Sequence, residues 1–263
     1  MPRVVALYRY PVKGFTPEEC RTLTILDEGR VAGDRVLAFR FADSAVPDDQ
    51  WSRKHDCVVL MNTPGLARLE VRFDHQARRL AIGLDGRTLA DEALDEEGRG
   101  RLASAMERYV GGLAENPLSG HPRRVPLRLI GNGVTPRFQD NVDGHTTLHG
   151  RGSLAAVSVA VGDPALSEVR FRSNIVVGGL DAWQELDWMG RRLLVGEVEF
   201  EVVKRKVRCL ATHANPRTGE RDMPLMPTLT RAFSQQEPTF AIGMTTRGAG
   251  GVVRIGDNVT PLD

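Results

Sequence analysis

The chain reads EVEFEVVKRKVRC over residues 197–209, and the first half of this stretch alternates between glutamates and apolar residues. Val198, Phe200 and Val202 share one face of this period-two pattern, which predicts a half-buried β-strand. The alternation breaks at Val203, where a β-bulge would reverse the facing of the residues that follow. After the bulge we expect one face to carry Lys204, Lys206 and Arg208 and the other to carry Val203, Val207 and Cys209.

Short runs suited to strands recur along the rest of the chain, separated by turn formers that include 27 glycines and 15 prolines. The predicted strands cover residues 3–8, 36–41, 57–61, 67–73, 80–84, 127–130, 155–161, 174–177, 197–203 and 252–255. Helical spacing of apolar residues predicts a helix over 97–113 and a short one that includes Leu225, Leu229 and Phe233. These patterns predict a mainly β protein with a few helices, closer to a barrel than to a βαβ fold.

Three turn-forming pairs mark a break in the chain over residues 115–124. The pairs are Asn116-Pro117, Ser119-Gly120 and His121-Pro122. A chain of 263 residues is long enough for one large domain or two small ones. We place a boundary at this break, which predicts one domain over 1–118 and a second over 119–263.

The charge balance excludes a dedicated nucleic-acid binder, because 35 basic residues face 34 acidic ones and phosphate contacts need a basic excess. Only four basic residues are lysines, and we attribute the arginine excess to genome composition. No apolar run approaches the roughly 18 residues that a membrane-spanning helix needs, so we expect no membrane span. The N-terminus is charged again by Arg9 and has no apolar signal core, so we expect a cytoplasmic protein.

The three cysteines, Cys20, Cys57 and Cys209, lie far apart and form no C-x-x-C motif. A disulfide framework, an iron–sulfur cluster and a cysteine-rich zinc site are therefore not expected. Cys209 differs from the other two because it follows four cations within five residues. Nearby positive charge favours the thiolate, which is a nucleophile or a soft-metal ligand. The alternative role is that of a small buried hydrophobe, which we expect for Cys20 and Cys57.

A second basic segment runs from Arg170 to Gly179. If it forms a strand, Arg170, Arg172 and Asn174 share one face. Two guanidinium groups and an amide on one face would make a surface that binds anions. The alternative is a half-exposed strand whose outer side is charged.

Three histidines are candidates for a metal or proton-transfer site. His145 and His149 are four residues apart, a spacing that suits metal binding on a helix. Glycines and threonines around them favour a loop, and without a third ligand structural zinc is not expected, while a role in lining a pocket stays open. His213 follows Cys209 by four residues and is a candidate proton donor, although a structural role is the more common one.

Several motifs carry a family resemblance in chain order: Arg172-x-Asn174-Ile175-Val176-Val177, Gly196, Arg208-Cys209, Asn215-Pro216-x-Thr218-Gly219 and Gly256-Asp257-x-Val259. This series resembles the MOSC domain, which is the C-terminal domain of molybdenum cofactor sulfurases and also occurs in amidoxime-reducing proteins. The N-terminal stretch VVALYRYPVK at 4–13 and the motif Gly33-Asp34-Arg35 resemble the β-barrel domain that precedes MOSC in the amidoxime-reducing group. The resemblance thus spans nearly the whole chain, and it implies a MOSC-type β-barrel preceded by a smaller β-rich domain.

The resemblance implies a pyranopterin molybdenum cofactor, with Cys209 as the catalytic residue whose thiolate binds molybdenum. The residues that it implies for cofactor binding are Lys13, Arg35, Arg172, Asn174, Arg208 and Thr212. Cationic, donor-rich walls suit the phosphate of such a cofactor, and molybdenum prefers a soft thiolate. One departure stands out, because Gly14 and Phe15 occupy the positions where family members often have Ser and Cys.

The implied function is that of a molybdenum-dependent oxidoreductase that reduces N-hydroxylated or N-oxide small molecules by oxygen-atom transfer. Because three cysteines cannot hold a four-cysteine cluster, electrons would come from a separate donor protein. One alternative is a sulfur-carrier or cofactor-handling module without its own redox turnover, in which Cys209 holds a persulfide. Another is a barrel that only binds a small anion. Pyridoxal phosphate is not expected, because the sulfurase domain that uses it is missing from this sequence and Lys13 is a poor Schiff-base candidate.

Overall fold

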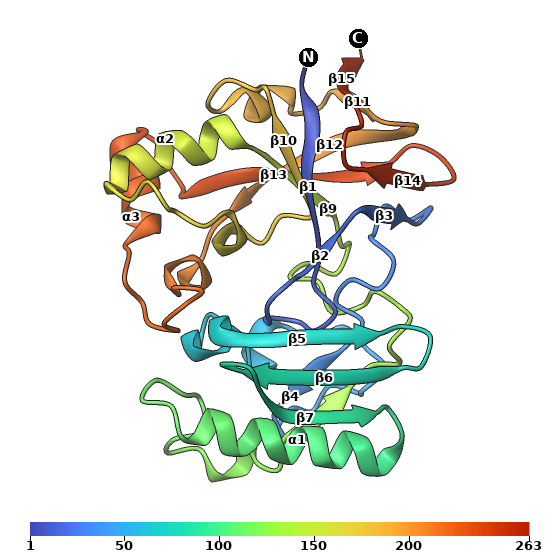
Figure 1. Cartoon of the computed structure of the whole chain (residues 1–263), viewed down its shortest axis with the longest axis vertical. Coiled ribbons are helices and arrows are strands. Elements are labelled where there is room, and N and C mark those ends of the chain that lie inside the picture. Colours follow the sequence, from blue (N-terminus) through green and yellow to red (C-terminus); the bar gives the residue numbers. More distant parts are fainter. Residues whose placement is uncertain (263) are drawn as a thin grey trace.

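The computed structural model describes residues 1–262, which form mainly β-strands with three α-helices and short 3₁₀ helices (Figure 1). The strands are β1 (Arg3–Arg9), β2 (Glu18–Cys20), β3 (Thr22–Ile25), β4 (Ala38–Arg40), β5 (Leu69–Asp74), β6 (Arg79–Leu84), β7 (Arg87–Ala93), β8 (Arg128–Ile130), β9 (Thr146–Gly150), β10 (Ile175–Gly178), β11 (Arg192–Val195), β12 (Val198–Val207), β13 (Thr239–Thr246), β14 (Gly251–Arg254) and β15 (Val259–Leu262). The α-helices are α1 (Glu96–Gly111), α2 (Arg151–Val161) and α3 (Leu225–Ala232). The 3₁₀ helices are η1 (Lys54–Asp56), η2 (Pro64–Arg68), η3 (Pro122–Arg124), η4 (Glu168–Phe171), η5 (Gln184–Trp188) and η6 (Leu210–His213). The prediction of a mainly β protein with a few helices is confirmed.

The largest layer is an eight-stranded sheet in the upper half of Figure 1, with the order β15-β11-β12-β13-β9-β10-β1-β2. Its neighbouring strands are antiparallel except β9 and β10, which run parallel. Parallel neighbours need a crossover connection, and α2 supplies it, so the sheet contains a βαβ unit that we did not expect. Within residues 1–262 the edge strands β15 and β2 do not pair, so the sheet is open and the expected barrel is not closed.

The strand predicted over residues 197–203 forms and is part of β12. In β12 the side chains of Val198, Phe200 and Val202 are buried, while the glutamates between them are partly exposed. The pairing with β13 skips one residue where Val202 faces Met244 and Lys204 faces Gly243, and it shifts again between Arg205 and Val207. Val203 is therefore a β-bulge, and the basic residues that follow it reach the end of the strand near Cys209.

Three other strand predictions are wrong. Residues 57–61 form only an isolated bridge between Cys57 and Arg40, and a turn follows it. Residues 155–161 form most of helix α2, which ends at Gly162 in the left-handed conformation. The buried carboxylate of Glu185 accepts hydrogen bonds from Gly150 N at 3.1 Å and Ser153 Oγ at 2.8 Å, which satisfies donors in the first turn of the helix. Residues 170–174 do not form a strand either, because η4 ends at Phe171, the Arg172 that caps it has a positive φ of 54°, and β10 starts only at Ile175.

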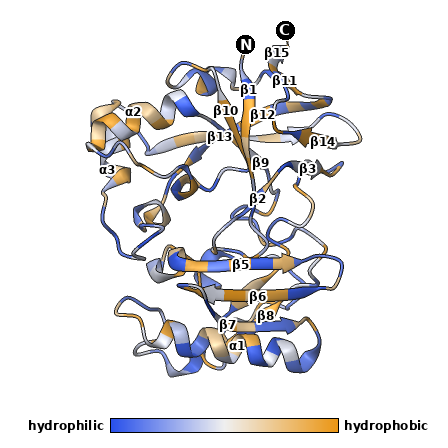
Figure 2. Ribbon diagram, viewed as in Figure 1, coloured by the Kyte–Doolittle hydropathy of each residue, from blue (hydrophilic) through white to orange (hydrophobic). Residues whose placement is uncertain are grey.

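The lower half of Figure 1 holds a three-stranded sheet, β5-β6-β7, with α1 packed beside it. β5 alternates buried and exposed residues, which Figure 2 shows as alternating colours. The apolar face of α1, with Leu102, Met106 and Val110, packs in the same core as Phe73 and Leu80. The helix starts near the predicted residue because the Asp95 side chain accepts a hydrogen bond from Gly98 N at 2.7 Å.

Strands cross between the two halves of the sequence. β1 and β2 belong to the large sheet, where β1 pairs with β10, and β3 pairs with β14. In the other direction β8, which follows residue 118, pairs with β4. The two halves of the chain therefore complete each other's sheets, and a boundary near residue 118 stays a prediction.

Among residues 1–262, α1 is the longest helix, and none of the helices is long and apolar enough to cross a membrane.

Candidate functional site

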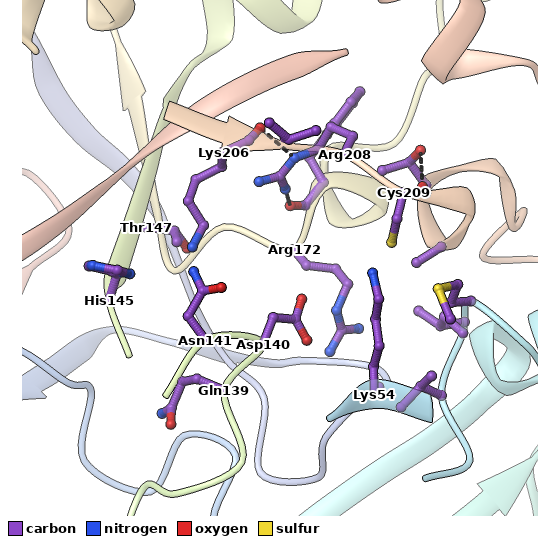
Figure 3. A pocket seen from close by; sticks show the side chains of 18 of the residues that line it. Lys54, Gln139, Asp140, Asn141, His145, Thr147, Arg172, Lys206, Arg208 and Cys209 are labelled. Atoms are coloured by element: carbon purple, nitrogen blue, oxygen red, sulfur yellow. Dashed lines mark hydrogen bonds between the residues drawn. The ribbon is translucent and has the colours of Figure 1, made fainter. Parts of the chain in front are cut away.

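A cavity of about 590 Å³ lies between the lower end of the large sheet and the loops of the smaller layer (Figure 3). Its walls come from four parts of the chain far apart in sequence, namely residues 14–61, 139–147, 170–172 and 204–212, together with Glu237. Nine of the lining side chains are cationic and two, Asp140 and Glu237, are carboxylates, so the cavity attracts anions.

Most of the residues singled out in the sequence meet in this cavity. Arg35, Arg172, Arg208, Cys209 and Thr212 line it. Lys13 and Asn174 do not line it, because both are fully buried behind its wall. The seven residues therefore lie in one region: five of them line the cavity, and Lys13 and Asn174 lie behind its wall.

Cys209 is partly exposed and directly follows the basic end of β12. It is the N-cap residue of η6, and its carbonyl oxygen accepts hydrogen bonds from Thr212 N and Thr212 Oγ1, both at 3.0 Å. Thr212 thus fixes the backbone that presents the thiol to the cavity. Cys57 is buried as predicted, and burial raises the pKa of its thiol. Cys20 was also predicted to be buried, but it is only partly buried, and it lies away from this cavity.

Two guanidinium groups stack on one buried tyrosine ring at the cavity wall. The Arg172 and Arg35 guanidinium carbons lie 4.4 and 4.8 Å from the centroid of the Tyr10 ring. Arg35 is also paired with Asp34, and Arg172 Nη1 donates to the carbonyl oxygen of Phe15 at 2.5 Å. These contacts hold each guanidinium in place, and both side chains line the cavity.

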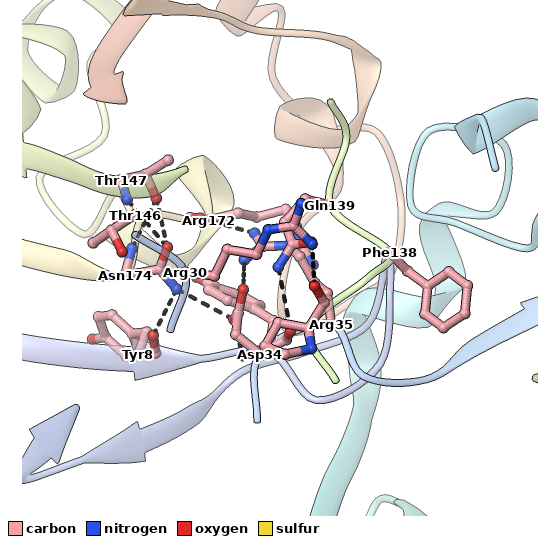
Figure 4. A network of polar contacts seen from close by, with 12 residues as sticks. Tyr8, Arg30, Asp34, Arg35, Phe138, Gln139, Thr146, Thr147, Arg172 and Asn174 are labelled. Atoms are coloured by element: carbon pink, nitrogen blue, oxygen red, sulfur yellow. Dashed lines mark hydrogen bonds and ion pairs between the residues drawn. The ribbon is translucent and has the colours of Figure 1, made fainter. Parts of the chain in front are cut away.

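The Asn174 side chain ties three chain segments together behind that wall (Figure 4). Its Oδ1 atom accepts hydrogen bonds from Thr147 N at 3.2 Å and Thr147 Oγ1 at 2.9 Å. Its Nδ2 group donates to Tyr8 O at 3.1 Å and to Asp34 Oδ1 at 3.2 Å. Through Asp34 this amide is connected to Arg35, so Asn174 positions a cavity residue without reaching the cavity.

Lys13, like Asn174, lies behind the cavity wall and positions a residue that lines the cavity. Its ammonium donates to the carbonyl oxygens of Phe138 at 3.0 Å and Gln139 at 3.1 Å, and it lies 3.8 Å from Asp140 Oδ1. Burial lowers the pKa of Lys13, and Asp140 opposes that effect. Lys13 thus holds the segment that projects Asp140 into the cavity.

Three cavity residues were missed in the sequence. Desolvation tends to raise the pKa of Asp140, but Lys13, Arg35 and Arg172 outweigh it and lower that pKa to about 2. Burial, followed by repulsion from Arg208, lowers the pKa of Lys206 to about 8. Lys54 reaches the cavity from η1. Of these, only Lys206 carried a signal in the sequence, because it was predicted to share a face with Lys204 and Arg208. The predicted separation of two faces is not seen, since Val207 and Cys209 line the cavity as well.

The structure gives the three candidate histidines different surroundings. His145 lines the cavity, and burial together with Lys206 lowers its pKa to about 4. His149 is buried in strand β9 rather than in the expected loop, its ring packs against the stacked pair Phe171 and Phe240, and burial lowers its pKa to about 4 as well. No cluster of three metal-ligating side chains occurs in residues 1–262. His213 accepts a hydrogen bond from Met226 N at 3.2 Å through Nε2, which is a structural contact.

The sequence predicted that Arg170 and Arg172 share one face of a strand, but Arg170 instead makes an ion pair that holds the fold together. Its Nη2 atom lies 2.9 and 3.0 Å from the two carboxylate oxygens of Asp222, and its Nη1 atom donates to His213 O at 3.1 Å. This ion pair, between the buried Arg170 and the exposed Asp222, links η4 to the loop after η6. The tertiary contact explains why residues 170–174 turn away from the strand conformation.

Comparison with known proteins matches residues 137–260 to the model of the MOSC domain. Molybdenum cofactor sulfurases from Caenorhabditis briggsae and Caenorhabditis elegans are each 41% identical over 73 residues, which is 28% of this chain and 10% of those proteins. Mitochondrial amidoxime reducing component 2 from Homo sapiens is 46% identical over 57 residues, 21% of this chain and 16% of that protein. This chain therefore spans only a small part of the curated relatives that it matches.

Solved structures resemble the chain more distantly. The YuaD protein from Bacillus subtilis is 10% identical and aligns over 98% of this chain and 94% of its own, with a TM-score of 0.42. YiiM from Geobacillus stearothermophilus is 16% identical over 45% of this chain and 54% of its own, with a TM-score of 0.34. The likeness to this family thus comes from the sequence: residues 137–260, just under half of the chain, match the MOSC domain, as the Arg172-x-Asn174 and Arg208-Cys209 motifs predicted.

Proposed function

We propose that the cavity binds a pyranopterin molybdenum cofactor and that the protein reduces N-hydroxylated or N-oxide small molecules with it. The observation that carries this proposal is the partly exposed thiol of Cys209 at the wall of a cavity lined by Arg35, Arg172 and Arg208. The sulfurase and amidoxime-reducing relatives support it, since both are named for molybdenum cofactor or amidoxime chemistry.

The residues of the cavity fit the chemistry of this cofactor. Its phosphate is an anion, and the free N–H groups of Arg35, Arg172 and Arg208 are suited to phosphate oxygens. Its pterin carries N–H donors, and the buried Oε1 atom of Gln139 has no hydrogen-bond donor in the described part of the chain. An acceptor that is buried without a partner costs stability, so a ligand donor at this point accounts for its presence.

The cofactor would supply a two-electron redox centre able to take up an oxygen atom. In the overall reaction an N-hydroxylated amidine takes up two electrons and two protons, loses its N–O bond and yields the amidine and water. The chain itself contributes the anchoring sulfur of Cys209 and the cations that hold the cofactor. The electrons come from a separate donor protein. For Lys13 and Asn174 we propose an indirect role, through Asp140 and Asp34.

The test is molybdenum content together with activity. Protein made in a host that synthesises the cofactor should contain about one molybdenum per chain by elemental analysis, and Cys209→Ser should lose most of it. Cys20→Ser is the matched control, because Cys20 lies outside the cavity. The wild type should then reduce benzamidoxime with a reduced viologen dye as donor. Wild-type protein without molybdenum, or loaded protein without activity, would refute the proposal.

A second function, sulfur transfer without redox turnover, is favoured by the sulfurase relatives together with the accessible thiol of Cys209. It predicts a persulfide on Cys209, seen by intact-protein mass spectrometry after incubation with a cysteine desulfurase and cysteine. The desulfurase supplies the sulfane sulfur, so no further oxidant is needed. A persulfide that forms on Cys209 in protein without molybdenum would support this alternative over the first.

A further inference from the structure

The cavity has two ends that differ in their side chains (Figure 3). His145, Thr147 and Lys206 lie at one end, and Cys209 lies at the other. Arg172 and Arg208 lie between them. Any molecule that reacts at a metal bound to Cys209 must therefore occupy the Cys209 end.

Lys54 reaches the Cys209 end from the opposite side of the cavity. It starts the short helix η1, whose backbone is closed by a hydrogen bond from Cys57 N to Lys54 O, so its Cα position is fixed. Its side chain is half-buried, and its ammonium makes no hydrogen bond or ion pair with residues 1–262. A cation that is held in a cavity without an anionic partner is a recognition group for one.

The other cations of the cavity differ from Lys54 in ways that single it out. Arg35 and Arg172 are stacked on Tyr10, and Arg208 donates to Phe171 O at 2.7 Å and Lys206 O at 3.0 Å. Arg53 and Lys204 are exposed, where water and salt screen their charge. Among the cations in residues 1–262, Lys54 is the one that lies at the Cys209 end, is half-buried and has no hydrogen-bond or ion-pair partner.

The surroundings of Lys54 indicate the kind of molecule that binds there. Leu60, Met61 and Ala211 line the same cavity and provide an apolar surface. A single ammonium is a point charge that matches a singly charged carboxylate, whereas a phosphate dianion is usually bound by several donors.

We propose that Lys54 selects substrates with a carboxylate on an otherwise apolar body. This inference rests on the proposed reduction of N-hydroxylated compounds and names the substrate class for it. The Lys54 ammonium pairs with the carboxylate and leaves the N–O group free to face the Cys209 end.

The experiment compares two amidoximes that differ only in charge, benzamidoxime and 4-carboxybenzamidoxime, with one reduced viologen dye as donor. We expect kcat/KM of the wild type to favour the carboxylated compound by about tenfold, mainly through KM, as for one charge-assisted hydrogen bond. Lys54→Met should abolish the preference, Lys54→Glu should reverse it, and Lys54→Arg should preserve it. Arg87→Met is the matched control, because Arg87 is an exposed cation on β7 away from the cavity and should leave the preference unchanged.

A binding measurement gives a second readout that needs no turnover. Titration calorimetry with the amidine products, benzamidine and 4-carbamimidoylbenzoate, should show the same preference and the same dependence on Lys54. Molybdenum content, measured on every variant, shows that the cofactor site is intact. Reduction of both amidoximes at equal efficiency, or a preference that survives in Lys54→Met, would overturn this inference while the proposed function stands. If neither amidoxime is reduced, the proposed function fails, and the calorimetry still decides whether Lys54 binds carboxylates.

Discussion

At the scale of single residues, Asp140 limits how strongly the cavity attracts anions. Its carboxylate lies among Lys13, Arg35, Arg172 and Lys206, all of which act to lower its pKa. Replacing it by asparagine removes one negative charge and keeps the shape. Because the Asp140 side chain is 72% exposed, water screens the effect, and we expect sulfate to bind cofactor-free Asp140→Asn about threefold to tenfold more tightly. Titration calorimetry measures this, and equal affinity in Asp140→Asn and wild type would contradict it. Asp43→Asn, an exposed site away from the cavity, is the control.

Lys206 makes anion binding depend on pH. Burial and Arg208 lower its pKa to about 8, and a bound anion stabilises the ammonium form. Affinity for sulfate should therefore be greatest below pH 8 and should fall as the pH rises through about 8 to 9. Three shifted groups nearby titrate elsewhere, since the pKa values of Asp140, His145 and Arg208 are about 2, 4 and 10.

The measurement is sulfate affinity between pH 6.5 and 9.5, roughly 1.5 units on either side of the lysine midpoint, in cofactor-free Cys209→Ser protein so that the thiol does not contribute. Lys206→Met in the same background should bind more weakly and show a flat profile across this range. A profile that keeps its slope without Lys206 would assign the titration to another group.

At the scale of elements, residue patterns predicted strands and helices correctly where interactions within the segment itself determine its conformation. The strict alternation in β12 and its break at Val203 led directly to the strand and its bulge. The same approach failed at residues 155–161, because several valines favour a strand while the crossover between β9 and β10 requires a helix there. It also failed at Arg170, whose ion pair with Asp222 comes from a segment 52 residues away.

The turn at Gly14 shows why this chain has a glycine where a serine was expected from the family. Gly14 has a φ of +78°, and a Cβ atom there would lie 2.6 Å from Val59 Cα. Gly14→Ala should lower the free energy of unfolding by about 2 to 4 kcal/mol, from left-handed strain and from a clash with fixed backbone. Gly86→Ala separates the two causes, because its φ is +74° and nothing lies within 4 Å of the added carbon. It should cost only about 1 to 2 kcal/mol in urea denaturation. Equal losses in the two variants would mean that the contact with Val59 relaxes without cost.

At the scale of the whole molecule, the site could be predicted only in part, because it is assembled from distant segments. The motifs identified the Arg208-Cys209 pair, and they also singled out Arg35 and Arg172, which meet at Tyr10. Lys54 lies in a segment without a motif, and its place opposite Cys209 follows from how the smaller layer packs against the large sheet. A linear pattern carries no information about such packing.

The exchange of strands between the two halves of the chain predicts that they unfold together. β1 and β2 complete the large sheet, and β8 pairs with β4 in the other part. Arg221 adds a link, since its Nη2 atom donates to Met61 O at 2.7 Å and its Nη1 atom to Leu210 O at 2.7 Å. Separating the halves would leave sheet edges and buried apolar residues without partners.

Tryptophan fluorescence can follow the two regions separately during urea denaturation. Trp51 lies beside η1 and donates a hydrogen bond to Gln139 O at 2.8 Å, whereas Trp188 is 3% exposed in the core of the large sheet. One variant keeps only Trp51, through Trp183→Phe and Trp188→Phe, and the other keeps only Trp188. Within each variant, the fluorescence transition should coincide with the far-ultraviolet circular dichroism transition, because both probes report one cooperative unit. If Trp51 changes in a separate, earlier transition, the smaller layer unfolds on its own, and the paired strands do not couple it to the sheet that carries Cys209.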